Sequence, residues 1–514
     1  MNHTVYHILA VLVALLCVPT TNVLAGRRIT SDELTITNIG VAEGLSQNTA
    51  RSLAIDKRGF VWVGTDDGLN RYDGSNFIVF KPNYEGEFNQ GGVTQVRDVQ
   101  VDGSGLLWLQ SVDMRRMCIS TVNEKPLTLH DERGREIQRF RQSELCILPD
   151  SMVLLYGGCK GAILFRGEGD AEPHCLWRDS ILYTAHTLGP DGSIWLGGRD
   201  LVRLSLNEDE QIDSHHYAIE GMAGRVTAVV ALPDMVIVAD GSAALHRIDI
   251  NSGRRLSDIN LAEGLVAEDI CELAHSLICI RCANGTLLIY DAAQQHFVNP
   301  STLGADRLGS RCSQFVRDNE GQIWICDDHG SIHHFDAINR IFRPVRVMSE
   351  EKAVQYSCLR NWRPPIIISD SFEPGVYWLG SYGGGLLRYD ENTETVDRIT
   401  SAEAYVPENI LAIRQDEVGN IWLGSEYIGI VKISPKRYVS HTLRPGLVDG
   451  FSSGNNVSVV FEGLDGNVWA GIRDGDLCIF NPNLTNLLSR KEGICPTCIV
   501  ADKRGRVWVG TDGH

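Results

Sequence analysis

Residues 56–73 read Asp-Lys-Arg-Gly-Phe-Val-Trp-Val-Gly-Thr-Asp-Asp-Gly-Leu-Asn-Arg-Tyr-Asp, and weaker copies of this stretch return along the whole chain. The copies recur at a period of about 40 to 47 residues, which is typical of a repeat architecture. Eleven repeat cores are found in this way, and in three of them another residue replaces the Trp. The Trp-equivalent positions are Trp62, Trp108, Leu155, Trp195, Val238, Cys279, Trp324, Trp378, Trp422, Trp469 and Trp508.

Each position of the core has a physical role. Asp56 and Gly59 form a tight turn, in which the carboxylate caps backbone amides and the glycine adopts a positive φ. Residues 60–63 are β-formers and predict a strand buried on both faces. Gly64 follows where a side chain would prevent close packing between neighbouring sheets. With strands before the core (residues 49–55) and after it (69–73 and 76–80), the unit has four antiparallel strands and predicts a propeller blade.

The fold class is therefore all-β, with tandem β-propellers. Leucine-rich, ankyrin and helical repeats need a helical period that is absent here, and a parallel β-helix has shorter coils. We expect the Trp side chains of the cores to be buried wedges between blades rather than ligand platforms, because large aromatic side chains dominate burial.

The spacing of the cores also predicts domains. Seven cores are evenly spaced from Trp62 to Trp324, but the step from Trp324 to Trp378 is longer and contains Pro364 and Pro365, which strands avoid. We therefore predict a seven-bladed propeller over residues 26–345. A second, truncated propeller of about four blades is expected over residues 346–514.

The N-terminus has the features of an export signal. Residues 8–18 are apolar but too few to span a bilayer, and Val23-Leu24-Ala25 fits the small-residue rule for cleavage before Gly26. We predict a signal peptide over residues 1–25 and a periplasmic mature protein. The formal net charge of −18 argues against nucleic acid and against direct binding to an anionic membrane.

Three segments carry a family resemblance: residues 44–48 (Gly-Leu-Ser-Gln-Asn), residues 56–65 around Trp62, and residues 68–74 (Gly-Leu-Asn-Arg-Tyr-Asp-Gly). Together they resemble the two-component regulator propeller repeat. The resemblance implies a periplasmic sensor region of a hybrid two-component system or a related membrane sensor. In that family two seven-bladed propellers precede an immunoglobulin-like domain, a membrane span and output domains, which are a histidine kinase or diguanylate cyclase.

The last repeat contains a central strand but is interrupted at His514. An open arc of blades would expose a strand edge and apolar faces. We therefore expect a longer parent protein, which would contact the membrane only through segments beyond this chain. A homodimer of that parent is a further expectation.

Three classes of function compete: a ligand sensor, which we favour, a propeller enzyme acting on glycans (hydrolase or lyase), and an interaction scaffold. Asp-box hydrolases place Asp and Trp five residues apart, whereas Asp56 and Trp62 are six apart. A pair of catalytic carboxylates is not identified by sequence alone. We predict no catalytic residues, no cofactor and no metal site.

Candidate ligand-binding residues follow from strand direction. The loop before the innermost strand and the turn after the Trp-x-Gly strand should emerge at the same end of every blade, around a central channel. Mixed Arg, Lys and Asp side chains there suit a polar small molecule or an oligosaccharide, including an acidic one bound through bidentate arginines. The predicted residues are Asn48, Asp66, Asp67, Arg115, Lys160, Arg199, Arg281, Asp328 and His329.

Two further patterns have ordinary explanations. His215-His216 and His333-His334 look like metal-ligand pairs, but adjacent residues of a strand point to opposite faces. Cys495 and Cys498 have redox-motif spacing without the βαβ context that activates a thiolate, so we expect a structural role or an adventitious disulfide.

Overall fold

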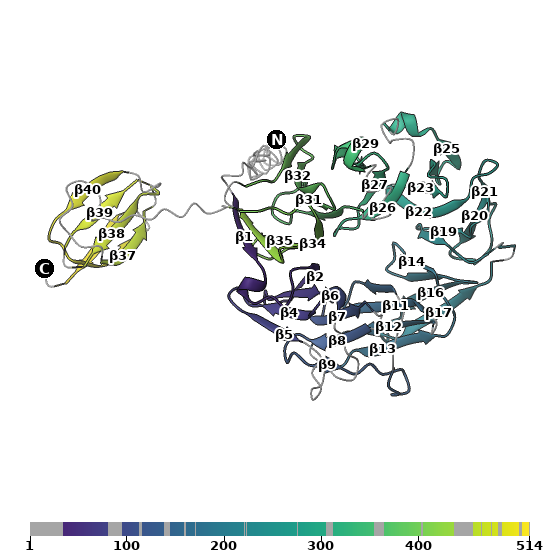
Figure 1. The fold of residues 1–514 in the computed structure, drawn as a ribbon, viewed down its shortest axis with the longest axis horizontal. Helices are drawn as coiled ribbons and strands as arrows, with labels where there is room; N and C mark the ends of the chain where they lie inside the picture. The colour runs from purple at the N-terminus through teal and green to yellow at the C-terminus, as the bar shows by residue number, and fades with distance from the viewer. Residues whose placement is uncertain are drawn as a thin grey trace, which may run out of the picture. The chain divides into compact units, whose positions relative to one another are not determined.

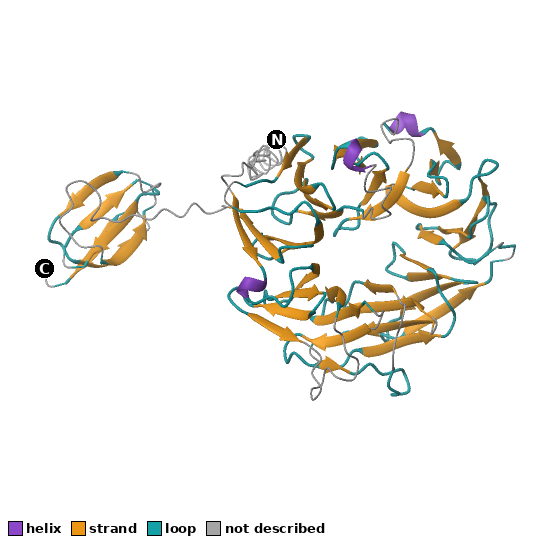
Figure 2. Cartoon of the chain, in the orientation of Figure 1, coloured by secondary structure: helices purple, strands orange, loops and turns teal. Residues whose placement is uncertain are grey.

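The protein is an almost purely β structure built from small antiparallel sheets (Figures 1 and 2). The computed structural model describes residues 34–512, apart from residues 81–94, 113–115, 138–143, 159–160, 170, 220, 223, 275, 305–311, 354–363, 402–403, 436–455, 464, 474, 482–485 and 503–505. Within the described residues there are eleven sheets, ten with four strands and one with two. The eleven repeat cores of the sequence each supply the second strand of one sheet, so the predicted propeller-blade repeat is confirmed.

The first blade shows how the repeat folds. Its strands are β2 (Ala50–Ile55), β3 (Val61–Thr65), β4 (Gly68–Tyr72) and β5 (Phe77–Phe80), paired in chain order. Asp56 closes the β2–β3 turn, because its Oδ1 accepts hydrogen bonds from the amides of Arg58 (2.9 Å) and Phe60 (3.0 Å). Gly59 takes the predicted positive φ, at 81°. Every residue of β3 and β4 is buried, as expected for central strands of a blade.

The same four-stranded order is repeated in the next seven blades. Blade two contains β6 (Val96–Val101), β7 (Leu106–Ser111), β8 (Arg116–Ser120) and β9 (Pro126–Leu127), and blade three contains β10 (Glu144–Ile147), β11 (Met152–Gly158), β12 (Gly161–Arg166) and β13 (His174–Asp179). Blade four contains β14 (Ala185–Leu188), β15 (Ile194–Gly197), β16 (Leu201–Leu206) and β17 (Ile212–Tyr217), and blade five contains β18 (Ala228–Ala231), β19 (Met235–Ala239), β20 (Ala244–Asp249) and β21 (Ile259–Asn260). Blade six contains β22 (Ala267–Ala274), β23 (Leu277–Cys282), β24 (Leu287–Asp291) and β25 (His296–Val298). Blade seven contains β26 (Cys312–Arg317), β27 (Ile323–Asp327), β28 (Ser331–Asp336) and β29 (Ile341–Arg346), and blade eight contains β30 (Ile366–Ser369), β31 (Val376–Ser381), β32 (Gly385–Asp390) and β33 (Thr395–Arg398).

Blade nine joins the two ends of the first compact unit. Its strands β34 (Ile410–Gln415), β35 (Ile421–Ser425) and β36 (Ile430–Pro435) are completed by β1 (Leu34–Ile39), which pairs antiparallel with β36. A strand from the N-terminal end therefore closes the last blade. The closure leaves no open sheet edge between the ends of the ring.

Nine apolar cores hold this ring together, one between each pair of neighbouring blades. The last of the nine lies between blades nine and one, where Trp422 and Ile430 pack with Leu53 and Val63. The other eight cores join the remaining neighbours in order. In the described residues the ring is thus closed, with nine blades rather than the predicted seven, above the usual range of roughly four to eight.

The predicted domain boundary after residue 345 therefore differs from the structure. One compact unit extends to Pro435, and Lys436–His514 form the second. The prediction was wrong because it took the long interval between Trp324 and Trp378 as a domain boundary. In the structure Pro364 and Pro365 of this interval come just before β30, within the first unit. The pairing of β1 with β36 joins residues that are distant in sequence, and the repeat spacing carries no sign of it.

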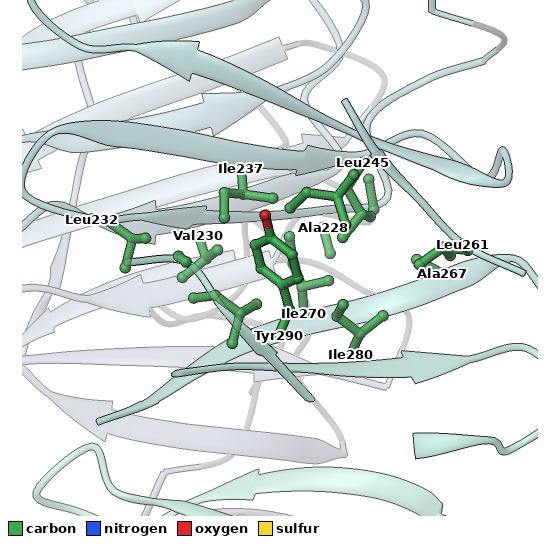
Figure 3. Close-up of a cluster of buried hydrophobic side chains, with 14 of the residues drawn as sticks. Ala228, Val230, Leu232, Ile237, Leu245, Leu261, Ala267, Ile270, Ile280 and Tyr290 are labelled. Atoms are coloured by element: carbon green, nitrogen blue, oxygen red, sulfur yellow. The ribbon is translucent and has the colours of Figure 1, made fainter. Parts of the chain in front are cut away.

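The core between blades five and six is drawn in Figure 3. The ring of Tyr290 lies among Ile237, Leu245 and Ile270, and all four side chains are buried. Close approach of blades also depends on the repeat glycine, as predicted for Gly64. A Cβ atom at Gly64 would lie 2.7 Å from Cγ1 of Val96 in the next blade. Any side chain at this position would push the two sheets apart.

The prediction of buried Trp wedges is confirmed in the ring and fails at one position outside it. Trp62, Trp108, Trp195, Trp324, Trp378 and Trp422 are all buried. Trp508 in the second unit is 58% exposed, because no further sheet covers it in the described residues. Trp469 is partly buried.

The second unit contains one four-stranded and one two-stranded sheet in its described residues. The first is formed by β37 (Val457–Glu462), β38 (Val468–Ile472), β39 (Leu477–Phe480) and β40 (Leu487–Lys491), and the other by β41 (Pro496–Ala501) and β42 (Val507–Thr511). Across the described part of the whole chain, no helix has the length and apolar character needed to cross a membrane. The predicted signal peptide lies outside the described residues.

Candidate functional site

The structure places the start of the first strand and the end of the second strand at the same end of a blade. In blade one Ala50 pairs with Thr65, so Asn48, Asp66 and Asp67 lie together at this end, as predicted. Asp66 forms a bidentate ion pair with Arg51, which donates from Nη2 to Oδ2 at 2.8 Å and also from Nε. Asn48 is engaged locally, since its Oδ1 accepts the amide of Val41 at 3.0 Å.

The other described candidates occupy equivalent places in their own blades. Arg199 is exposed in the β15–β16 turn. Asp328 and His329 lie in the β27–β28 turn, where His329 is 3.1 Å from Oε1 of Glu350. Arg281 lies near the end of β23 and forms an ion pair with Glu268 at 2.6 Å. Arg115 and Lys160 lie outside the described residues. The contacts described for these candidates are formed with residues of the same blade or of the segment next to it. These contacts do not join candidates of different blades into one cluster.

The nine first strands form the inner ring of the propeller. Strand β2 contacts both β6 and β34, and β18 contacts both β14 and β22. Several of these strands contain a one-residue register shift at the second position, and the extra residues include Arg51, Arg97 and Glu268. A β-bulge bends the strand and redirects its side chain. The same local irregularity therefore presents a charged group at the rim of three blades.

Arg317 is the charged group whose influence crosses the inner ring. It ends β26 in blade seven and is exposed. Burial, together with the positive charge of Arg317, lowers the pKa of His186 in blade four to about 4. Burial raises the pKa of Cys146 in blade three to about 11, which Arg317 opposes. Within the described residues no hydrogen bond or ion pair joins the Arg317 side chain to another residue, and its charge opposes the rise that burial causes in the pKa of Asp269 in β22.

A second charge interaction spans blade one. Burial lowers the pKa of Arg414 in β34, and the carboxylate of Asp98 in β6 opposes that shift. Asp98 accepts hydrogen bonds from Ser52 (2.9 Å) and from Gln100 (2.8 Å). The inner ring therefore carries charges of both signs.

Cys146 and His186 form the arrangement closest to a nucleophilic pair. Cys146 Sγ lies 3.1 Å from His186 Nε2, and His186 Nδ1 lies 3.0 Å from the Tyr156 hydroxyl. Their pKa shifts favour a neutral thiol beside a neutral imidazole, whereas nucleophilic cysteines are activated by a lowered pKa. The geometry supports a buried polar chain more than a catalytic centre.

Sequence reasoning missed Arg51, Arg317 and the Cys146–His186 pair. A signal existed for Arg51, because Arg51 and Arg97 occupy the same place in two successive repeats. No such signal marks Arg317, since the residues that its charge affects come from distant blades. Cys146 and His186 are 40 residues apart, at equivalent positions of neighbouring repeats, so the repeat period could have paired them.

The histidine pair 333–334 and the cysteine pair 495/498 lie in the described part of the chain. His333 Nε2 lies 3.1 Å from Asp327, and His334 Nε2 lies 2.7 Å from Gln322, so the two rings serve different partners. Cys495 and Cys498 are free thiols. Within the described residues, no group of three or more His, Cys, Asp or Glu side chains is arranged to hold a metal ion.

Comparison with known sequences identifies the repeat. The family described as "Two component regulator propeller" matches residues 44–67 and 493–513. The chain contains two-component regulator propeller repeats. The first match covers the β2–β3 hairpin with the loop before it, and the second covers β41 and β42. A histidine kinase P4 of Formosa agariphila is 46% identical to this chain over 43 residues, which are 8% of this chain and 3% of that protein.

Two solved structures are similar to this chain at low sequence identity. The extracellular domain of a putative hybrid two component system from B. thetaiotaomicron is 14% identical, covering 92% of this chain and 75% of that chain with a TM-score of 0.29. A streptogramin B lyase is 12% identical, covering 78% of this chain and 97% of that chain with a TM-score of 0.33. The sheet order of this chain is what establishes the propeller architecture here.

Proposed function

We propose that this propeller region is the extracytoplasmic sensor of a two-component signalling protein and binds a polar small molecule or oligosaccharide at the inner ring. The regulator propeller repeats support the signalling role. The kinase activity of the histidine kinase relative belongs to that protein, and here a link to an output domain is part of the proposal.

The observation that carries the ligand site is the guanidinium of Arg317. It is exposed, and its charge reaches residues of blades three, four and six. Arginine binds carboxylates through two parallel hydrogen bonds, which favours an acidic oligosaccharide over a neutral one. Arg281, near the end of β23, is already paired with Glu268, so we assign it a smaller part.

Thermal-shift titration of residues 26–514 with matched neutral and acidic oligosaccharides tests this function. A ligand that binds only the folded state raises its apparent stability. We expect an acidic oligosaccharide to raise the melting temperature of the wild type, and Arg317→Gln to abolish that rise. Lys57→Gln, in the exposed β2–β3 turn of blade one, is the control and should bind as the wild type does. Equal responses of the two variants would contradict the assignment of Arg317.

The same samples separate the sensor from an enzyme. A sensor should leave the oligosaccharides intact over prolonged incubation, whereas sustained cleavage would favour the enzyme alternative. Export is tested by N-terminal sequencing of protein from the periplasm. The mature chain should begin near Gly26, and a chain that begins at Met1 would argue against the export signal.

A further inference from the structure

A cavity lies at the end of the blades opposite to the predicted ligand-binding turns. Its volume is about 390 Å³, within the range of small-molecule sites. Three consecutive blades supply its walls: blade six through the end of β22, blade seven through the β26–β27 turn and the end of β28, and blade eight through β31 and the residue after β32. Its polar lining side chains are Glu272, Gln322, His334, Asp336, Tyr377 and Glu391.

His334 is the central polar group of this cavity. Its side chain is only 5% exposed, and its ring is stacked on Trp324 with a centroid distance of 4.4 Å. On one side, Nε2 lies 2.7 Å from Gln322 Oε1. On the other side, Nδ1 has no hydrogen-bond partner in the described residues and lies 3.3 Å from Glu391 Oε1. A buried polar atom without a partner is costly, and it marks a place where a ligand could bind.

The hydrogen bonds around His334 indicate which kind of group a ligand would have to supply. Gln322 Oε1 is an acceptor, so His334 donates to it from Nε2, and the Tyr377 hydroxyl donates to the same oxygen at 3.4 Å. In the neutral imidazole the other nitrogen then carries a lone pair. In that neutral form the lone pair lies 3.3 Å from Oε1 of Glu391, and a donor that contacts both atoms would pair them. A ligand N–H group placed there would satisfy both.

The surrounding charges favour a cation. Asp336 is neutralised by Arg343, whose Nη2 lies 2.8 Å away. Burial acts to raise the pKa of Asp336, but hydrogen bonds from Asn339 and Arg343 outweigh it and lower that pKa. Among the described residues, neither Glu272 nor Glu391 has an arginine hydrogen-bonded to it as Asp336 does, although Glu391 lies 3.3 Å from His334 and interacts electrostatically with Arg343. Burial and then the Glu391 carboxylate raise the pKa of Tyr389 to about 12, as expected near negative charge.

We propose that this cavity binds a small polar ligand through a protonated primary amine, which donates hydrogen bonds to Glu391 and to Nδ1 of His334. Hydrogen bonds between charged partners are about twice as strong as neutral ones, so the amine supplies the selectivity. Glu391 remains reachable, because its side chain is 24% exposed. The ligand proposed for this cavity is opposite in charge to the one proposed for Arg317.

Matched pairs of probes test the amine directly. Glucosamine is compared with glucose, ethanolamine with ethylene glycol, and cadaverine with 1,5-pentanediol, each by calorimetric titration of the full chain. We expect at least one amine to bind with an affinity about tenfold or more above that of its hydroxyl counterpart. If no amine is preferred over its counterpart at millimolar concentration, the proposal is wrong.

Two isosteric variants locate the binding. Glu391→Gln should weaken binding of the preferred amine about tenfold or more. Glu394→Gln is the matched control, because Glu394 is three residues away, is exposed and pairs with Arg343 rather than lining the cavity. It should bind as the wild type does. Equal affinity in wild type and Glu391→Gln, or equal losses in the two variants, would overturn the assignment.

Discussion

The indole nitrogen of Trp62 donates a hydrogen bond to Oδ2 of Asp56, six residues earlier, at 3.0 Å. The other oxygen of the same carboxylate holds the turn amides of Arg58 and Phe60. One carboxylate thus closes the hairpin and fixes the buried indole. The same bond joins Trp108 to Asp102 (2.8 Å), Trp324 to Asp318 (3.1 Å) and Trp422 to Asp416 (2.9 Å).

Blades with a shorter spacing lack this bond. Asp191 precedes Trp195 by only four residues, and Asp465 precedes Trp469 by the same number. In both blades the indole N–H is buried without a hydrogen-bond partner in the described residues. A spacing of six residues therefore places one carboxylate between the turn and the indole, as does the spacing of eight between Asp370 and Trp378 (2.8 Å), whereas a spacing of four does not.

The substitution Asp56→Asn should destabilise the ring. The new side-chain amide would keep an oxygen for the turn amides but present its NH₂ group to the indole N–H of Trp62, leaving two donors face to face in a buried place. We expect a loss of about 1–3 kcal/mol in the free energy of unfolding. Calorimetric melting of the full chain measures it.

The control for this variant is Asp191→Asn. Asp191 makes no bond to Trp195, its side chain is 51% exposed, and it pairs with Arg203. Loss of an exposed ion pair costs at most about 1 kcal/mol. Equal destabilisation by the two substitutions would show that the Asp56–Trp62 bond contributes nothing specific.

Closure of the ring by β1 can be tested by crosslinking. Thr35 and Ser434 are direct partners in the β1–β36 ladder, where Cα atoms are close enough for a disulfide. Thr35→Cys/Ser434→Cys should therefore form an intramolecular disulfide that peptide mass mapping detects. The double variant Thr35→Cys/Arg346→Cys places the second cysteine at the end of β29, where a seven-bladed ring would end, and should stay unlinked. Linkage of the second pair instead of the first would support seven blades.

The blades were predictable because every repeat carries its own signal. Asp56, Gly59, Trp62 and Gly64 each serve a contact within the blade or with the next one. The number of blades in the ring was not predictable, because it depends on which distant strand pairs with β36. No residue of β1 departs from the repeat pattern in a way that would identify β36 as the strand with which it pairs.

The candidate site was predictable only in part. Strand direction correctly placed Asn48, Asp66 and Asp67 at one end of blade one. Interactions across the ring depend on how many blades separate two residues, as for Arg317 and His186. Local spacing contains no information about that separation.

Stability should fall on acidification through His186. Burial and the charge of Arg317 lower its folded pKa to about 4, whereas an unfolded histidine has a pKa of about 6.5. As the pH falls, the unfolded chain takes up the proton first, so the contribution of neutral His186 to stability is lost between about pH 6.5 and pH 4. Below about pH 4 the loss is complete.

Melting temperatures of the wild type and His186→Gln from about pH 8 to pH 4 measure this contribution. The difference between the two proteins should change with pH mainly between about pH 6.5 and pH 4, and the variant should have the flatter profile. His216→Gln is the control, since His216 is exposed on β17. Its melting temperature should depend on pH in the same way as that of the wild type. Parallel profiles for wild type and His186→Gln would contradict the buried, neutral state of His186.

Two tryptophans at equivalent repeat positions should differ sharply in their contribution to stability. Trp324 is fully buried, packs against Tyr377 and Tyr389 of the next blade, and bonds to Asp318. Trp324→Ala should therefore cost about 3–5 kcal/mol and lower the transition of the first unit. Trp508 is 58% exposed and its contact with Asp502 is long, at 3.4 Å, so Trp508→Ala should change the transition of the second unit by about 0.5 kcal/mol or less. Calorimetry of the full chain separates the two units, and a large loss from Trp508→Ala would mean that another surface covers this indole in solution.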